Sequence, residues 1–272
     1  MRFKAFIFIQ CIILYSQYDS LSAKALIGEY VRRVRPDEFN FIVSIERINA
    51  SNPIIQNNHD CTGVLVSQKT VLTSAHCLAT MKLDETVIVV GSTDLRRGRN
   101  FYPSFWLSYD RWISLKNKES QYSLNDIAII KLATEVPGYI HPVLLSTKPS
   151  IELYGLRVVT AGWGENRNGD INNFLEAVIV NVIPHRECEN KIFRATGERI
   201  SIGKNLLCTV ANPYALLCRG DSGGPLLDNG KLIGINKGVC LYPEFRFHPD
   251  KINIHMSINH YKDFIVDVIQ NF

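Results

Sequence analysis

The chain has 272 residues, of which 46% are hydrophobic and 21% are charged, and its formal net charge at pH 7 is +4. This is the balance of an ordinary globular protein, and it excludes a disordered, collagen-like or coiled-coil chain. A chain of this length can bury a large core and does not need disulfides or metal ions in order to fold. It has no run of five like charges, because Val34 interrupts the basic stretch at 32–35, so a nucleic-acid-binding surface is not indicated.

The N-terminal segment 1–22 has the order of parts found in a secretory signal peptide. Two basic residues precede a mostly apolar run of about eleven residues that ends at Tyr15, and small residues follow. The apolar run is shorter than the ~20 residues that span a bilayer as a helix. The alternative is a buried N-terminal strand or helix. We expect cleavage after Ser22 or Ala23, no later membrane span, and a secreted, extracellular mature protein.

Short runs rich in β-branched residues recur along the mature chain. Clusters of Gly, Pro, Asn and Ser separate them, which is the pattern of strands and turns. Strands at this density, with few helical windows, suggest a barrel or a sandwich. Strands are predicted at 41–45, 63–66, 70–73, 86–90, 127–132, 156–160 and 232–235.

One helix is predicted at the C-terminal end of the chain, over 260–272. Phe264, Ile265, Val268 and Ile269 recur there at helical spacing, and charged residues lie off that stripe. We therefore expect the apolar face of this helix to pack on the core.

No internal repeat or low-complexity tract divides the mature chain. The segment 137–150 is the best candidate for a crossing between two halves of the chain, since it follows a run of strand-like residues and begins with Pro-Gly. Asn49 begins an Asn-Ala-Ser sequon, which is an N-glycosylation acceptor in a secreted protein. The sequence leaves the occupancy of this site open.

The cysteines fit an oxidising compartment. Of seven, Cys11 lies in the signal segment, and the even number that remains predicts three disulfides. Six cysteines allow fifteen pairings, and their number does not choose between them. No Cys-x-x-Cys pair exists, so a zinc or redox motif has little support. The six are Cys61, Cys77, Cys188, Cys208, Cys218 and Cys240.

Three short segments carry residues suited to nucleophilic catalysis. They read Leu-Thr-Ser-Ala-His-Cys at 72–77, Asn-Asp-Ile-Ala-Ile-Ile-Lys-Leu at 125–132 and Cys-Arg-Gly-Asp-Ser-Gly-Gly-Pro-Leu at 218–226. A lone His or a strand-edge Asp is usually structural. The third segment is the informative one, because glycines on both sides of Ser222 suggest a strained turn whose backbone N–H groups approach a ligand. An oxyanion site requires that geometry.

With His76, Asp126 and Ser222 in this order, the sequence resembles the trypsin/chymotrypsin family of secreted serine endopeptidases. The likeness extends to the run at 39–45, to Ala-Gly-Trp-Gly at 161–164 and to the C-terminal helix, so it covers nearly all of the mature chain. The resemblance implies an all-β fold of two six-stranded antiparallel β-barrels with a C-terminal helix.

The resemblance also implies a role for each of these residues. Ser222 is the expected nucleophile, and His76 is the base that takes its proton and returns it to the leaving amine. Asp126 is expected to orient His76 and to stabilise the imidazolium. The backbone N–H groups of Gly220 and Ser222 are expected to form the oxyanion hole. The alternative is a secreted, non-catalytic homologue that binds a partner; the presence of all three residues favours the enzyme.

The same resemblance implies how the cysteines pair. One bridge clamps the loop that carries His76, one closes a loop in the second barrel, and one ties the Ser222 loop to the opposite wall of the specificity pocket. The implied pairs are Cys61–Cys77, Cys188–Cys208 and Cys218–Cys240.

The specificity pocket departs from the family pattern. Leu216, six residues before the nucleophile, stands at the pocket base where trypsins have Asp, so an apolar residue is expected before the scissile bond. The opposite wall, 232–240, is about two residues shorter than in the family and lacks its Trp. Either Asn236 or Lys237 replaces the family's Ser that supports the catalytic Asp. Asp250 either lines the pocket or lies in a surface loop.

The family is activated when a short propeptide is cut and the new α-amine pairs with the Asp before the nucleophile, here Asp221. The nearest match to the family's start begins at Leu26, so the mature protein is expected to begin at Leu26 or Ala25. The expected organisation is a signal peptide at 1–22, a short propeptide at 23–25 and a protease domain at 26–272.

No cofactor or metal is implied. The loop at 92–99 offers Asp94 as its one carboxylate among three arginines, which is a poor site for Ca²⁺. His248, His255 and His260 are not spaced like a zinc motif and are expected at the surface. The implied partners are protein or peptide substrates and protein protease inhibitors, with no nucleic acid, no membrane and a monomeric state.

Overall fold

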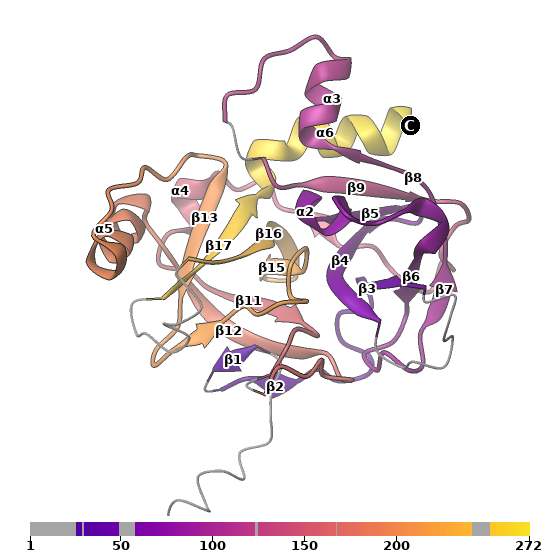
Figure 1. Cartoon of the computed structure of the whole chain (residues 1–272), viewed down its shortest axis with the longest axis horizontal. Coiled ribbons are helices and arrows are strands. Elements are labelled where there is room, and N and C mark those ends of the chain that lie inside the picture. Colours follow the sequence, from indigo (N-terminus) through magenta and orange to yellow (C-terminus); the bar gives the residue numbers. More distant parts are fainter. Residues whose placement is uncertain (1–25, 29, 49–57, 123–124, 167, 241–250) are drawn as a thin grey trace, which may run out of the picture.

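The computed structural model consists of two β-sheets side by side, with helices on the outside (Figure 1). Among the residues that it describes, no helix has the length and hydropathy that a membrane-spanning helix needs. The predicted signal peptide and propeptide, Asn49 and Asp250 lie outside the described residues, and only the backbone of Ile27, Val239 and Cys240 is described. The described ranges are 26–28, 30–48, 58–122, 125–166, 168–240 and 251–272.

The first sheet is formed by the N-terminal half of the chain, and neighbouring strands are antiparallel. Its strand order is β7-β6-β3-β4-β5-β9-β8. β-branched side chains fill its interior, where Val43, Ile45, Val71, Ile88 and Ile130 are buried. Such residues pack well on a pleated surface. The strands are β3 (Ile42–Arg47), β4 (His59–Ser67), β5 (Thr70–Thr73), β6 (Thr86–Val90), β7 (Arg99–Phe101), β8 (Pro103–Ser108) and β9 (Ala128–Leu132).

The second sheet closes on itself. Its strands follow the order β16-β15-β11-β12-β13-β17, and β17 pairs with β16 again, which makes a six-stranded antiparallel barrel. β10 and β2 add at its margins, and β1 (Ile27–Gly28) pairs with β14 (Ala215–Leu216) beside it. The strands are β2 (Arg32–Arg33), β10 (Leu144–Leu145), β11 (Arg157–Gly162), β12 (Glu176–Ile183), β13 (Leu206–Val210), β15 (Pro225–Asp228), β16 (Lys231–Cys240) and β17 (Ile252–Ser257).

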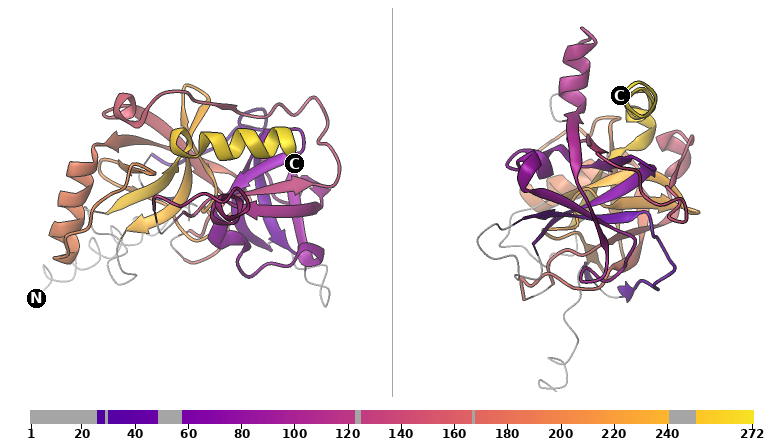
Figure 2. Two further views of the ribbon diagram at one scale, coloured as in Figure 1. Left: turned by 90° about the horizontal axis from the view of Figure 1, so that it is seen from above. Right: turned by 90° about the vertical axis from the view of Figure 1, so that its right-hand side faces the viewer.

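The predicted C-terminal helix is confirmed as α6 (Ile258–Asn271). It begins beside the second sheet and ends over the first (Figures 1 and 2). Phe264, Ile265 and Val268 are fully buried in a cluster that draws residues from both sheets, so α6 holds the two halves together by apolar burial. The other helices are α2 (Ala75–Leu78), η1 (Leu83–Glu85), α3 (Tyr109–Leu115), α4 (Ser150–Leu153) and α5 (His185–Thr196).

Two of the three predicted disulfides are present. The Cys61–Cys77 bridge joins β4 to α2, and the Cys188–Cys208 bridge joins α5 to β13. The third stays a prediction, because the side chain of Cys240 lies outside the described residues. The first bridge matters for the site, since it ties a strand of the first sheet to the helix that carries His76.

One sequence-based expectation about the histidines is wrong. His255 was expected at the surface, but it lies on β17 with no exposed surface. The reason is that β17 pairs on both of its edges, with β13 and with β16, in the closed barrel. His260 is half-buried on α6, and His248 lies outside the described residues.

Candidate active site

His76 and Asp126 are brought together by the pairing of β5 with β9. Thr73 at the end of β5 lies opposite Ala128 at the start of β9. The two residues therefore meet although 50 positions separate them: Nδ1 of His76 lies 2.7 Å from one carboxylate oxygen of Asp126, and the His76 backbone N–H donates to the other at 2.8 Å.

The electrostatics of this pair decide which ring nitrogen of His76 carries the proton when the ring is neutral. Burial raises the pKa of Asp126, but the hydrogen bonds from His76 and the charge of Lys237 outweigh burial, so the net pKa lies below its ordinary value. The carboxylate is therefore ionised at neutral pH and can only accept a hydrogen bond, which places the ring proton of His76 on Nδ1. Nε2 of the neutral ring is then free to accept a proton. The ring is about half exposed, with 47% of its side chain accessible.

The sequence left open whether Asn236 or Lys237 takes the place of the family's Ser beside Asp126, and the structure distinguishes the two residues. The charge of Lys237 acts on Asp126 and lowers its pKa. The side chain of Asn236 is fully buried and turned elsewhere, with Nδ2 at 3.2 Å from the carbonyl oxygen of Asp221 and Oδ1 at 3.0 Å from Thr160. Of the two residues, Lys237 is thus the one whose charge acts on Asp126.

Ser222 lies in the turn that precedes β15, and this turn docks on the first sheet. Its carbonyl oxygen accepts the backbone N–H of Thr62 at 2.9 Å and lies 3.9 Å from Sγ of Cys77. Nε2 of His76 also lies 3.9 Å from that sulfur. The disulfide of Cys61 with Cys77 therefore borders both the expected nucleophile and the expected base.

The predicted glycine-dependent turn is present around Ser222. Gly220 has φ +96° and Gly223 has φ +81°, in the left-handed region that L side chains rarely adopt. A Cβ on Gly223 would lie 2.1 Å from Oγ1 of Thr73 and 2.2 Å from the carbonyl oxygen of Thr62. Conformation and close packing both require glycine there.

The peptide planes of the two expected oxyanion donors are held by their carbonyl oxygens. The oxygen of Arg219 accepts the N–H of Glu165 at 2.7 Å, and that of Asp221 accepts the N–H of Gly224 at 3.1 Å and Nδ2 of Asn236 at 3.2 Å. A trans peptide directs its N–H opposite to its C=O, so the N–H groups that follow Arg219 and Asp221 point away from these partners. Neither has a hydrogen-bond partner among the described residues.

Asp221 is a carboxylate with no exposed surface. Its two oxygens accept the N–H groups of Gly164 at 2.9 Å and Cys218 at 2.8 Å. Burial raises its pKa to about 7, although these hydrogen bonds act in the opposite direction. No cationic side chain among the described residues pairs with it, and a buried carboxylate is costly without such a partner.

Two glycines make the space for Asp221. A Cβ on Gly162 would lie 2.2 Å from its Oδ1, and a Cβ on Gly164 would lie 2.5 Å from its carboxyl carbon. The Ala-Gly-Trp-Gly segment therefore serves the pocket of this carboxylate.

Gly164→Ala is expected to destabilise the protein by about 1–3 kcal/mol, the usual range for overpacking in a tight site. The carboxylate of Asp221 is held by backbone donors and cannot withdraw. Gly138→Ala is the matched control, because a Cβ at Gly138 meets no atom within 4 Å, and it should change stability by less than about 0.5 kcal/mol. Urea unfolding of both variants measures the difference. Equal midpoints would contradict the crowding of this site.

The segment at the expected mature N-terminus packs beside the nucleophile turn. Leu26 has no exposed surface and lies in one apolar cluster with Leu217. Ile27 pairs with Leu216 through the backbone. This pairing places the segment next to the strand that leads into Cys218 and Asp221.

The expected pocket base, Leu216, is 3% exposed, and sequence reasoning missed the residue that holds it. Oδ1 of Asn253 accepts the N–H of Leu217 at 2.9 Å, and its Nδ2 donates to the carbonyl of Ala215 at 2.8 Å. Asn253 thus clamps the backbone on both sides of Leu216. Nothing in the local sequence marks it, because its place depends on the pairing of β17 with β13 and β16.

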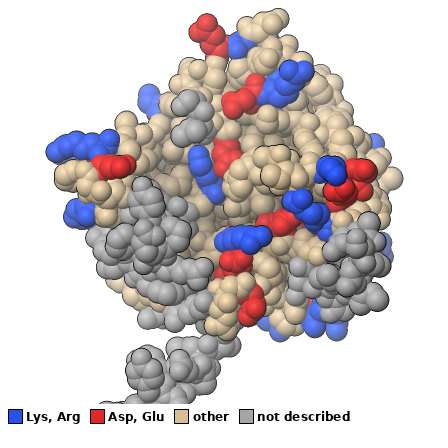
Figure 3. Space-filling view, viewed as in Figure 1, with Lys and Arg blue, Asp and Glu red and all other residues tan. Residues whose placement is uncertain are grey.

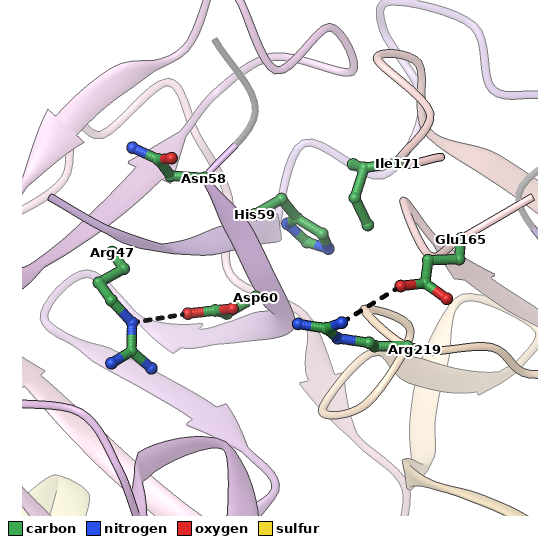
Figure 4. A pocket seen from close by; sticks show the side chains of 7 residues that line it. All are labelled: Arg47, Asn58, His59, Asp60, Glu165, Ile171 and Arg219. Atoms are coloured by element: carbon green, nitrogen blue, oxygen red, sulfur yellow. Dashed lines mark hydrogen bonds and ion pairs between the residues drawn. The ribbon is translucent and has the colours of Figure 1, made fainter. Parts of the chain in front are cut away.

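A polar pocket of about 270 Å³ lies on the other side of the nucleophile turn (Figure 4). Arg219 is turned toward Glu165 at 3.5 Å, and Arg47 toward Asp60 at 3.2 Å. These two pairs balance the charge of the lining. Basic and acidic side chains also alternate over the face seen in Figure 3. The lining residues are Arg47, Asn58, His59, Asp60, Glu165, Ile171 and Arg219.

His59 forms the wall between this pocket and the nucleophile turn. Its Nε2 lies 3.0 Å from the carbonyl oxygen of Gly220, and its Nδ1 lies 2.7 Å from Oγ of Ser44. Burial lowers the pKa of His59 to about 4, so the ring is neutral at physiological pH. Oγ1 of Thr62 also donates to the Gly220 carbonyl, at 2.8 Å, and the two side chains hold this part of the turn in place.

Comparison with known proteins agrees with the fold. The sequence model of the family described as Trypsin matches residues 31–265. Trypsin iota of Drosophila melanogaster is 28% identical over 185 residues, which are 66% of this chain and 69% of the relative. Chymotrypsin-2 of Vespa crabro is 32% identical over 180 residues, which are 65% of this chain and 76% of the relative.

Among solved structures, that of neuropsin, a serine protease expressed in the limbic system of mouse brain, is similar with a TM-score of 0.67 and 23% identity. The match covers 89% of this chain and 99% of that chain. The closed barrel, the neighbouring sheet and the C-terminal helix are therefore those of a chymotrypsin-like protein. The chain belongs to the trypsin family of serine proteases.

Proposed function

We propose that the protein is a secreted serine endopeptidase that hydrolyses peptide bonds through an acyl-enzyme on Ser222. The observation that carries this proposal is the pair of His76 and Asp126, which holds Nδ1 of the His76 ring on the carboxylate and leaves Nε2 to accept a proton beside the nucleophile turn. Secretion is supported by the pattern of the N-terminal segment and by two disulfides, which persist in oxidising compartments.

In the first half of the proposed reaction, Oγ of Ser222 attacks the scissile carbonyl carbon while Nε2 of His76 takes the hydroxyl proton. Asp126 stabilises the imidazolium that results. The carbonyl oxygen becomes an oxyanion, which the N–H groups of Gly220 and Ser222 stabilise. When the C–N bond breaks, His76 gives its proton to the leaving amine.

In the second half, a water molecule takes the place of the amine. Nε2 of His76 accepts a proton from the water as its oxygen attacks the acyl carbon, and the same two N–H groups stabilise the second oxyanion. Collapse of this intermediate breaks the ester bond, and the proton returns from His76 to Oγ of Ser222. The enzyme is regenerated and an acid product leaves.

Labelling with a fluorophosphonate probe tests the proposal, because the probe phosphonylates an activated serine. The processed protein should take up the probe on Ser222, as seen by peptide mapping. Absence of labelling would favour the non-catalytic homologue. The probe should fail on heat-unfolded protein, which controls for nonspecific reaction.

Cleavage specificity follows from the pocket base. Leu216 is buried and uncharged, so an apolar residue is expected before the scissile bond, and an unpaired buried Lys or Arg is penalised. Profiling of the activated protein on a peptide library measures this preference. Leu216→Asp is the complementary variant and should gain cleavage after Lys or Arg. If the unaltered protein cuts mainly after Lys or Arg, the assignment of Leu216 is wrong and Asp250→Gly becomes the next variant.

Activation is proposed to follow the family's route. The α-amine created at Leu26 or Ala25 would pair with Asp221, and that ion pair would order the oxyanion turn. The buried, unpaired carboxylate of Asp221 and the burial of Leu26 beside β14 support this.

A further inference from the structure

Asn236 lies where the nucleophile turn meets the helix of His76, and no step of the proposed reaction uses it. Its backbone carbonyl accepts Oγ of Ser74, which precedes that helix, and the N–H of Gly223, both at 2.8 Å. Its backbone N–H donates to the carbonyl of Gly224, also at 2.8 Å. One buried residue therefore joins the segments that carry the expected base and the expected nucleophile.

The orientation of the Asn236 amide follows from its neighbours. The carbonyl oxygen of Asp221, 3.2 Å away, can only accept, so the amide nitrogen must face it. Oδ1 therefore faces Oγ1 of Thr160 at 3.0 Å and Nδ1 of His255 at 2.9 Å. All three contacts are satisfied in this orientation, whereas the flipped amide would bring two acceptor oxygens together.

The position of the ring proton on His255 follows from its hydrogen-bond partners in the same way. Because Oδ1 of Asn236 only accepts, the proton of His255 must be on Nδ1. Nε2 of the neutral ring then accepts from Oγ1 of Thr209 at 2.8 Å. Burial lowers the pKa of His255 to about 3, which keeps the ring neutral. Hydrogen bonds thus run in one direction from Thr209 through His255 and Asn236 to the carbonyl of Asp221.

This chain of hydrogen bonds ends on the peptide that carries an expected oxyanion donor. The peptide between Asp221 and Ser222 is planar and trans, so fixing its carbonyl oxygen also fixes the direction of the Ser222 N–H. We propose that Asn236 is a positioning residue that aims the Ser222 N–H at the developing oxyanion, and that His255 and Thr209 hold its amide in the required orientation. This inference rests on the proposed function.

The two donor peptides differ in how they are held. The plane that aims the Gly220 N–H is fixed by a backbone N–H, that of Glu165. The plane that aims the Ser222 N–H is held by a backbone N–H, that of Gly224 at 3.1 Å, and in addition by a side chain, that of Asn236 at 3.2 Å. Side-chain substitution can therefore loosen the Ser222 donor while the Gly220 donor stays in place.

Asn236→Leu and Thr209→Val test this assignment. Leucine keeps the branching of Asn236 but offers nothing to the Asp221 carbonyl. Because the donor is misdirected rather than removed, kcat should fall by about 10- to 100-fold, less than the 10²–10³ lost with a whole donor, at unchanged KM. Thr209→Val removes only the far end of the chain and should give a smaller loss of the same kind.

Thr70→Val is the matched control, because Thr70 is also fully buried but its hydroxyl has no hydrogen-bond partner within the described part of the chain. It should leave kcat unchanged.

The measurement is kcat per active site, with the sites counted by titration with a fluorophosphonate. A merely structural role would lower the number of titrated sites and leave the kcat of each site intact. A peptide aldehyde inhibitor, whose adduct places an oxygen in the oxyanion hole, should lose affinity in parallel with kcat. If Asn236→Leu does not fold, Thr209→Val alone decides.

Unchanged kcat per titrated site in the variants that fold would overturn the inference and leave the proposed function standing. If the unaltered protein takes up no fluorophosphonate, the proposed function fails and the inference fails with it.

Discussion

Ser222→Ala is expected to lower kcat by about 10⁶-fold, the loss seen when the nucleophile of such a group is removed. The substitution deletes one hydroxyl from a turn that glycines and backbone hydrogen bonds hold in place, so folding should be nearly unchanged. Kinetics on the activated protein and thermal unfolding measure the two effects. Ser114→Ala, on the exposed face of α3, is the control and should change neither.

His76→Ala should cost a similar factor, and the double variant should be little worse than either single one, because the three residues act as a unit. Asp126 would keep its buried carboxylate in that variant, which predicts a loss of stability that Ser222→Ala does not share. Equal turnover by Ser222→Ala and the unaltered protein would show that Ser222 is not the nucleophile.

Asp221→Asn is expected to nearly abolish activity with His76, Asp126 and Ser222 unchanged. The asparagine amide is uncharged and cannot form the proposed ion pair with the new α-amine, so the oxyanion turn would lose the partner that orders it. The measurement is kcat/KM of processed protein whose N-terminus has been sequenced. A processed chain that begins well upstream of Ala25 and is fully active would contradict this route of activation.

The unprocessed chain offers a second test of Asp221, through the pH dependence of its stability. Burial raises the carboxyl pKa from 3.8 to about 7 in the folded state, so the folded state binds the proton more tightly. The stability that this proton contributes is fully present below pH 3.8 and is lost as the pH rises through about 7. Asp221→Asn removes this contribution.

Urea unfolding of the precursor at pH 5 and pH 8 compares the two chains. The unaltered precursor should lose more stability than the variant over this range. His59 and His255 have lowered pKa values, so their contribution to stability rises with pH. Both histidines are present in both chains, and their contributions therefore cancel when the two chains are compared. Equal losses of stability in the two chains would show that the carboxyl of Asp221 does not change its protonation between pH 5 and pH 8, which contradicts the prediction.

In the processed enzyme, the new α-amine also makes the stability of the active conformation depend on pH. Pairing with Asp221 should raise the pKa of the amine above its free value of about 7.7–8.0. The active conformation is then fully stabilised below that free value and lost as the pH rises through the raised one. Acetylation of the new N-terminus should remove both activity and this alkaline transition.

Local sequence was sufficient for the elements whose residues repeat with a clear period. The runs at 70–73 and 86–90 coincide with β5 and β6, and the apolar stripe of the last helix is buried as α6. By contrast, α5 (His185–Thr196) was missed, because most of its residues are polar and only Cys188 and Ile192 are buried. The stability of this helix comes from its tertiary packing rather than from an apolar stripe that the sequence would reveal.

The motifs likewise predicted His76 and Asp126, through the resemblance of the ordered segments to the trypsin/chymotrypsin family, and the structure brings the two residues together. The sequence by itself also determined the need for glycine at Gly220 and Gly223, whose positive φ values the structure bears out. These features depend on a few adjacent residues, so local patterns suffice.

Only the tertiary structure decided which side chains of β16 and β17 face the site. The ladder between them is irregular between Asn236 and Gly238, opposite His255 and Ile254. Side chains alternate between the two faces of a strand, so one extra residue reverses what each position faces. The buried amide of Asn236 contacts His255 because these two residues lie opposite each other in this ladder, and no pattern within either strand reveals that register.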